Sequence, residues 1–217
     1  HLNAVADTPA LRAAYNDNLP TVTEFFTKLG ADERLFAKYK NMAAAPSAQA
    51  LSAPRRKVLE NALRDFVLSG AELQGAARER FAQIQAQAAA LSQAYREHVL
   101  DATDSFKLDV PAADLAGVPA DVLAATRVSP DGKAPGANEA TPGLHRLTLH
   151  APVYLPVMQY AHNRALRKTM YTASTTRASE LGPSALDNTP VMQTLLALRH
   201  EEAQLLGHAS YAHVSLV

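Results

Sequence analysis

The residues whose spacing comes nearest to a chemical motif lie in the stretch His200–Gln204, which reads His-Glu-Glu-Ala-Gln. It is one residue short of the zinc-binding signature His-Glu-x-x-His. In that signature, two neutral imidazoles on one helix face hold Zn²⁺ while the glutamate acts on the metal-bound water. The second ligand position here is Gln204, whose neutral amide oxygen is a poor substitute for imidazole. We therefore predict no metal site, with His200 on a solvated helix face.

The same stretch is typical of an ordinary helix. Thr189 is suited to the N-cap, and Pro190 follows it at the first helical position. Gly207 predicts the helix end, so the next histidine, His208, lies beyond the helix and cannot complete the motif. One face of this predicted helix is apolar and contains Val191, Leu195, Leu198 and Leu205.

Three further histidines are candidate metal ligands. His98 falls on an apolar helical stripe, and neither a carboxylate nor a histidine follows it four residues later. A hydrogen-bonded core or boundary histidine is therefore favoured over a metal ligand at this position. His145 and His150 are five residues apart, so on a strand they point to opposite faces and cannot chelate one ion.

A small basic cluster, Arg164, Arg167 and Lys168, is typical of a solvated face; it could also meet a substrate carboxylate or an acidic partner helix. The segment 129–132, Ser-Pro-Asp-Gly, lacks the Gly-Lys-Ser/Thr of a phosphate loop and is interpreted as a turn. These patterns assign no catalytic residue and no metal ligand, and they leave the substrate-binding residues unknown.

Composition excludes several classes of protein. Of the 217 residues 47% are hydrophobic, yet no stretch of 18 is apolar, so we expect a soluble chain with a real core and no membrane span. Lys+Arg and Asp+Glu both number 21, which argues against a nucleic-acid binder. Without cysteine there is no disulfide framework and no thiolate metal site, which fits a cytoplasmic location.

The two ends of the chain look like cuts in a longer protein. The sequence begins with His1 rather than methionine and ends on the apolar Val-Ser-Leu-Val. No charged segment followed by an apolar segment begins it, so no secretory signal is expected.

Helical periodicity dominates up to about residue 104. A first helix is expected from Thr8 and Pro9 to Gly30, with a kink at Pro20; a second starts at Asp32 and ends before the next proline. A third is expected from a Ser52 cap to a stop at Gly70. The apolar positions of these three helices are Leu11, Ala14, Tyr15, Phe25, Phe26, Leu29, Leu35, Phe36, Tyr39, Val58, Leu59, Ala62, Leu63 and Phe66.

The strongest pattern lies between Gly75 and Asp104, where apolar residues recur at alternating steps of four and three. It predicts one helix of roughly 40 Å that needs one or more partner helices to cover its stripe. The stripe consists of Ala77, Phe81, Ile84, Ala88, Leu91, Tyr95, His98 and Ala102.

A β insert is expected within this helical chain. The segments Ser105–Val110 and Leu144–His150 alternate apolar and polar residues, which predicts two short paired strands. The Pro/Gly-rich excursion that joins them contains one short helix, about Pro119 to Arg127.

Helices resume after Pro152, and Asn163 is expected to cap the second of two. The fold class predicted is mainly α: antiparallel helical hairpins or a bundle with one long helix and a small two-stranded β insert. Three segments follow: 1–104 with N-terminal helical hairpins, 105–150 with the strands, and 151–217 with C-terminal helices. The positions expected to be buried after Pro152 are Val157, Tyr160, Ala161, Leu166, Met170 and Tyr171.

Four blocks carry a resemblance to a known family: "VLENALRDFVLSGAEL", "RFAQIQAQAAALSQAYREHVLDATDSF", "YLPVMQYAHNRALRKTMYTASTTRASE" and "DNTPVMQTLLALRHEEAQLLGHASYAHVSL". Together they resemble the N-terminal half of the thimet-oligopeptidase-like zinc peptidases, from about Thr8 to Val217. The resemblance implies an almost entirely helical fold with two lobes around a deep channel that admits short peptides. It also implies a zinc ion held by a His-Glu-x-x-His helix and a later glutamate, none of which has a matching position here.

The resemblance thus implies the N-terminal, channel-forming portion of a zinc-dependent oligopeptidase that hydrolyses short peptides. The implied partners are short peptide substrates and the C-terminal catalytic lobe. Zinc belongs to the full-length parent, and this segment alone is expected to bind none and to be inactive. The alternative is a non-enzymatic helical protein-interaction module. The reading frame beyond Val217 discriminates the two, since only the first encodes His-Glu-x-x-His.

Overall fold

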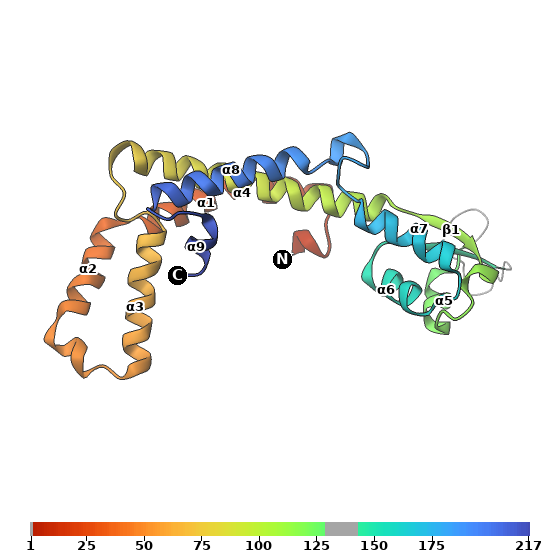
Figure 1. The fold of residues 1–217 in the computed structure, drawn as a ribbon, viewed down its shortest axis with the longest axis horizontal. Coiled ribbons are helices and arrows are strands. Elements are labelled where there is room, and N and C mark those ends of the chain that lie inside the picture. The colour runs from red at the N-terminus through yellow and green to blue at the C-terminus, as the bar shows by residue number, and fades with distance from the viewer. Residues whose placement is uncertain (1, 129–142) are drawn as a thin grey trace. The chain divides into compact units, whose positions relative to one another are not determined.

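The computed structural model describes residues 2–128 and 143–217 (Figure 1). Within these residues the chain is mainly helical with a small two-stranded antiparallel sheet, which confirms the predicted fold class. Two compact units are present: unit 1 contains residues 1–94 and 191–217, and unit 2 contains residues 95–190. The boundaries of these units differ from those of the three segments predicted from the sequence, which divide the chain by type of secondary structure. The three segments stay a prediction.

The first helices of unit 1 are held at their ends by local hydrogen bonds. Thr8 accepts a bond of 3.2 Å from the backbone nitrogen of Leu11, and Asp32 accepts bonds from Arg34 and Leu35. Side-chain caps of this kind satisfy amide groups that have no partner inside the helix. The elements are a short 3-10 helix Leu2–Ala4, α1 (Pro9–Gly30), α2 (Glu33–Ala44), a 3-10 helix Pro46–Ala50 and α3 (Ala53–Leu68).

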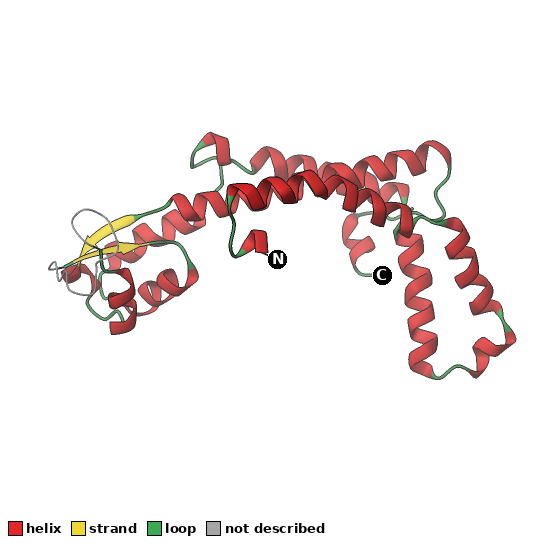
Figure 2. Ribbon diagram, turned by 180° about the vertical axis from the view of Figure 1, so that it is seen from behind, coloured by secondary structure: helices red, strands yellow, loops and turns green. Residues whose placement is uncertain are grey.

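Helices α2 and α3 form a hairpin, and both views show them running side by side (Figures 1 and 2). Phe66 of α3 packs against the rings of Phe36 and Tyr39 of α2, with centroids 5.5 and 5.3 Å apart. One expectation for α3 was wrong: Val58, placed on the apolar stripe, is 70% exposed. Ser52 occupies the predicted N-cap position, although its side chain makes no cap bond.

The long helix is α4 (Gly75–Ser105), as the stripe predicts. Phe81 and Ile84 of the stripe are buried, and so is Ala102 in unit 2. In unit 1 the N-terminal part of α4 has α8 as a partner, to which Arg80 and Gln85 bind. The helix α8 (Thr189–Leu205) was expected from the sequence, and a short helix α9 (Tyr211–Ser215) follows it.

Unit 2 contains the predicted β element, drawn in yellow in Figure 2. β1 (Leu108–Pro111) pairs antiparallel with β2 (Leu144–Leu147), and Leu108 lies opposite Leu147. The pairing is confirmed, although each strand covers only part of its predicted segment. The turn expected at 129–132 lies outside the described residues. The other elements are a 3-10 helix Ala112–Leu115, α5 (Ala120–Thr126), α6 (Ala151–Tyr160), α7 (Arg164–Thr175) and a 3-10 helix Ser184–Leu186.

A single apolar cluster packs the sheet of unit 2 against α5, α6 and α7. Burying such side chains supplies most of the favourable free energy of folding. Tyr160 and Tyr171 were expected here but are 52% and 56% exposed, because the faces of α6 and α7 that carry them point away from the cluster. The cluster contains Val110, Leu115, Val118, Val122, Leu147, Leu149, Val157, Ala161, Leu166 and Met170.

Within the described residues, no helix combines the length and the apolar character needed to cross a membrane.

Gly117 has less room for a side chain than the other described glycines. Its φ of +93° lies in the left-handed region, and a Cβ there would collide with the carbonyl oxygen of Tyr160. The amide of His162 donates a 2.8 Å bond to the carbonyl of Ala116, which holds the two segments together. Only glycine fits this approach without strain.

We therefore predict that Gly117→Ala lowers the free energy of unfolding by more than about 1 kcal/mol, because the positive φ and the backbone clash add. Urea unfolding followed by circular dichroism measures this. Gly182→Ala is the control, since its Cβ would meet atoms only at 3.6 and 3.8 Å and should cost little. Equal midpoints for the two variants would contradict the prediction.

Candidate functional site

The first glutamate of the zinc-like stretch joins two helices. Arg80 of α4 donates two hydrogen bonds to Glu201 of α8, from Nε to Oε1 at 2.6 Å and from Nη2 to Oε2 at 2.7 Å. The bond from Arg80 holds the pKa of the Glu201 carboxyl below its ordinary value. A glutamate held in this bidentate pair is a structural anion rather than a general base for a metal-bound water.

The position that would be the second zinc ligand closes the helix end instead. Gln204 Nε2 donates to the carbonyl oxygens of His208 and Ala209, at 3.2 and 3.3 Å. Gly207 takes a φ of +78° just after the helix, as its predicted role as a stop requires. His200 is exposed. Within residues 2–128 and 143–217, no group of three or more acidic or histidine side chains could hold a metal ion.

The histidine on the long helix has a hydrogen-bond partner from a distant segment. His98 Nδ1 lies 2.8 Å from Oδ1 of Asn188, and Nδ2 of Asn188 donates to the carbonyl of Tyr95 at 3.1 Å. Asn188 is only 1% exposed. This pair therefore has the geometry of a structural link within unit 2.

The two strand-region histidines have separate partners. His145 is buried, with Nδ1 3.1 Å from the hydroxyl of Thr126. Burial, with the charge of Arg127 adding to it, lowers the pKa of His145. His150 is exposed and lies after β2, where its Nε2 is 2.8 Å from Oδ1 of Asp104. The structure thus does not bring the two rings to one ligand.

The basic cluster lies along α7. Arg167 donates to the carbonyl of Ala161, whereas Arg164 and Lys168 are exposed. All three residues line an open groove of about 730 Å³ together with Met158 and Tyr171. The groove is open and no buried side chain is among its lining residues. The basic cluster is therefore described as a solvated surface.

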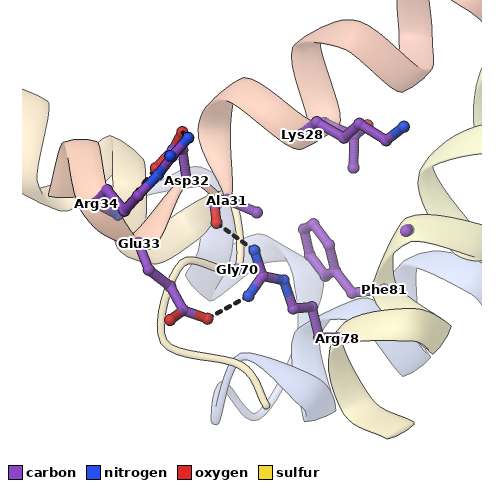
Figure 3. Close-up of a pocket in the computed structure, with 10 residues that line it drawn as sticks. Lys28, Ala31, Asp32, Glu33, Arg34, Gly70, Arg78 and Phe81 are labelled. Carbon is purple, nitrogen blue, oxygen red and sulfur yellow. Dashed lines mark hydrogen bonds and ion pairs between the residues drawn. The ribbon is translucent and has the colours of Figure 1, made fainter. Parts of the chain in front are cut away.

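One cavity of unit 1, of about 380 Å³, lies where α1, α2 and α4 meet (Figure 3). Figure 3 shows Arg78 reaching from α4 to the carbonyl of Ala31 and to Glu33, and the first of these bonds is 2.6 Å. Lys28 pairs with Glu24, and Arg34 pairs with Asp32, at 2.5 and 3.4 Å. Because the charges of this cavity are paired, it is best described as a polar clamp at the junction of α1 and α2.

A second cavity, also of about 380 Å³, shares Thr27 and Phe81 with the first. We call it the Glu202 pocket. Glu202 contributes the only ionisable side chain among its lining residues, all of which are described, and Oε1 accepts a 3.0 Å bond from Gln85. Burial raises the pKa of the Glu202 carboxyl. The lining residues are Val22, Thr23, Phe26, Thr27, Leu68, Ser69, Phe81, Gln85 and Glu202.

Sequence reasoning did not identify this pocket, although one signal was present. Glu202 follows Leu198 by four residues and precedes Leu205 by three, which places a carboxylate on the apolar face of α8. A charge on an apolar helix face indicates either a partner or a site.

Comparison with known proteins defines the class. Residues 1–78 match the model described as Neurolysin/Thimet oligopeptidase, N-terminal domain, and residues 157–217 match Peptidase family M3. These matches confirm the resemblance stated from the four sequence blocks: the chain belongs to the thimet-oligopeptidase-like peptidases.

Within that family the similar relatives are named oligopeptidase A. Over the whole chain, identity is 43% to the protein of Salmonella typhimurium and 42% to that of Escherichia coli. It is 39% to the probable cytosolic oligopeptidase A of Arabidopsis thaliana. The chain spans only about 31% of the length of the two bacterial relatives and 30% of the plant one.

Replacing the pocket carboxylate should change the pH dependence of stability. Since the pKa of Glu202 is raised in the folded chain, the folded state keeps this proton to higher pH than the unfolded state. Stability then falls as pH rises through the raised pKa, because the ionised group is partly desolvated. We expect Glu202→Gln to remove this slope and to be more stable than wild type at pH 7, by less than about 1 kcal/mol after solvent screening.

Urea unfolding at a series of pH values between about 4 and 8 measures how the free energy of unfolding depends on pH. This interval covers ordinary and raised carboxyl pKa values. Glu79→Gln on the exposed side of α4 is the control and should leave the slope unchanged. A Glu202→Gln variant less stable than wild type at pH 7 would show that the carboxylate is needed for the fold.

Proposed function

We propose that this chain is the N-terminal, channel-forming portion of a zinc-dependent oligopeptidase that hydrolyses short peptides. The observation that carries the proposal is 43% identity to an oligopeptidase A along the entire chain. The chain spans 31% of that relative, so the remaining length leaves ample room for a catalytic lobe. The match to Peptidase family M3 at residues 157–217 supports the same assignment.

Zinc is proposed for the remainder of the protein. The donor set of the described residues does not fit the ion, because Gln204 stands where a ligand is required and binds backbone carbonyls instead. We assign no catalytic residue and no metal ligand to this chain. Its contribution is shape: helices that border the substrate channel and exclude folded proteins.

The proposed partners are short peptides and the catalytic lobe of the same protein. The side chain of Leu216, near the C-terminus, is 86% exposed and is suited to contact with a catalytic lobe. Leu205, Leu206 and Val214 are partly buried within unit 1. A cytoplasmic location is proposed as well, and the name of the plant relative, probable cytosolic oligopeptidase A, supports it.

The alternative is a helical protein-interaction module without a peptidase parent. The feature that favours it is α1, where no residue of the 22 is buried and where Phe25 and Phe26 are 61% and 63% exposed. An apolar helix face of this kind serves a partner protein as readily as a second lobe.

We predict that residues 1–217 alone show no chelator-sensitive turnover of a quenched peptide substrate in the presence of added Zn²⁺. The full-length protein is expected to cleave the same peptide and to lose this activity with a chelator. Both proteins are assayed side by side at matched concentration. Zinc-dependent cleavage by the short chain would overturn the assignment of catalysis to the remainder.

The reading frame beyond Val217 is the second test. It is expected to encode His-Glu-x-x-His within a helix, because this spacing places both imidazoles on one face. A gene that ends without this motif would favour the interaction module.

A further inference from the structure

The Glu202 pocket is built from four parts of unit 1. Val22 and Phe26 come from α1, Leu68 from the end of α3, Phe81 from α4 and the carboxylate from α8. Its volume of about 380 Å³ falls within the range of small-molecule sites, roughly 300–1,000 Å³. All of its lining residues belong to one compact unit, so the site is complete without the other unit.

Among the described residues, no cation forms an ion pair with the carboxylate of this pocket. Its hydrogen bond comes from the neutral amide of Gln85, and Glu202 makes no ion pair with any described residue. Arg80 is held by Glu201, and Arg199 lies over the ring of Tyr211 with its guanidinium carbon 5.1 Å from the centroid. The charge of Arg199 attracts the Glu202 carboxylate and offsets part of its desolvation, but the two make no ion pair. The carboxylate is therefore only partly compensated by the protein's own cations.

The walls of the Glu202 pocket are suited to the aliphatic part of a ligand. Phe81 forms a floor that is 4% exposed, whereas Val22 and Phe26 stand at the rim with 50% and 63% of their area exposed. Apolar walls leading to one anion are complementary to an amphipathic cation, which buries its methylene groups and keeps its charged head at a polar partner. Aromatic rings add attraction for such a cation.

We propose that the Glu202 pocket binds an ammonium or guanidinium group on an aliphatic stem, as carried by a lysine or arginine side chain of a short peptide. This inference rests on the proposed function for its choice of peptides as the source. The cavity at Arg78 is not equivalent, because its acids Asp32 and Glu33 already have guanidinium partners. The occupant of the Glu202 pocket would supply a directly paired cation and give the peptidase a preference for basic peptides.

The test uses the full-length protein stripped of zinc with a chelator, so that peptides bind without being cleaved. Fluorescence anisotropy compares labelled pentapeptides that carry either lysine or norleucine at one position, and this position is moved along the peptide. Norleucine keeps the aliphatic stem and removes the charge. At one position we expect lysine to bind about fivefold to tenfold more tightly, the size of a charge-assisted contact in a partly exposed site.

Glu202→Gln should abolish this preference, and Glu79→Gln on the exposed face of α4 should retain it. Since the glutamine variant is expected to be at least as stable as wild type, loss of the preference is not a loss of folding. Phe26→Ala should weaken the lysine and norleucine peptides alike, because it removes the wall that both stems contact.

Three results would overturn the proposal. The first is a lysine preference that survives Glu202→Gln. The second is that free butylamine displaces the labelled lysine peptide at the same concentration as the unlabelled lysine peptide does, which would reassign the pocket to free amines. The third is no preference together with a full-length protein destabilised by Glu202→Gln, which would mean that the protein's own cation fills the pocket. Chelator-sensitive cleavage by the wild type is scored separately, so the proposed function can stand when the pocket proposal fails.

Discussion

The ion pair between Arg80 and Glu201 sets the orientation of α8 on which the chemistry of unit 1 depends. The two residues are 121 positions apart in the sequence, yet both oxygens of the carboxylate are engaged. Their side chains are 35% and 41% exposed, so solvent screens the attraction between the two charges. The larger effect of the pair is to fix the rotation of α8 about the helix axis. Successive residues of a helix point about 100° apart, so with Glu201 held by Arg80 the next residue, Glu202, faces Gln85 and the pocket.

The zinc-like stretch therefore has a structural explanation for three of its polar residues. Glu201 joins α8 to α4, Glu202 enters the pocket, and Gln204 binds carbonyl groups beyond the helix end. A metal site would need the side chains at positions 200 and 204 to converge on one ion. His200 is exposed and Gln204 binds backbone carbonyls, so the resemblance to a catalytic motif is one of sequence and not of geometry.

Features set by short-range forces could be read from the sequence. Thr8, Asp32 and Asn163 cap helices because their oxygens reach amides two or three residues away, and the two strands follow from alternation of polarity. Burial was harder to predict from the sequence. Val58 and Tyr171 lie at the helical spacing of apolar residues but are exposed, because this spacing does not show how wide the covered face of the helix is. The pocket, and the pairing of His98 with Asn188 over 90 positions, depend on long-range packing.

The exposed apolar face of α1 has to be considered together with the pocket that opens beside it. Val22 and Phe26 belong to both, and the carboxylate they lead to forms no ion pair with a described residue. Sealing that carboxylate under a second lobe would desolvate a charge that no ion pair stabilises, which is unfavourable. The part of α1 near Glu202 is therefore better suited to the proposed solvent-filled channel, where a cationic ligand can enter and leave. Side chains remote from the Glu202 carboxylate, such as Leu216, are the ones suited to a permanent contact with the proposed catalytic lobe.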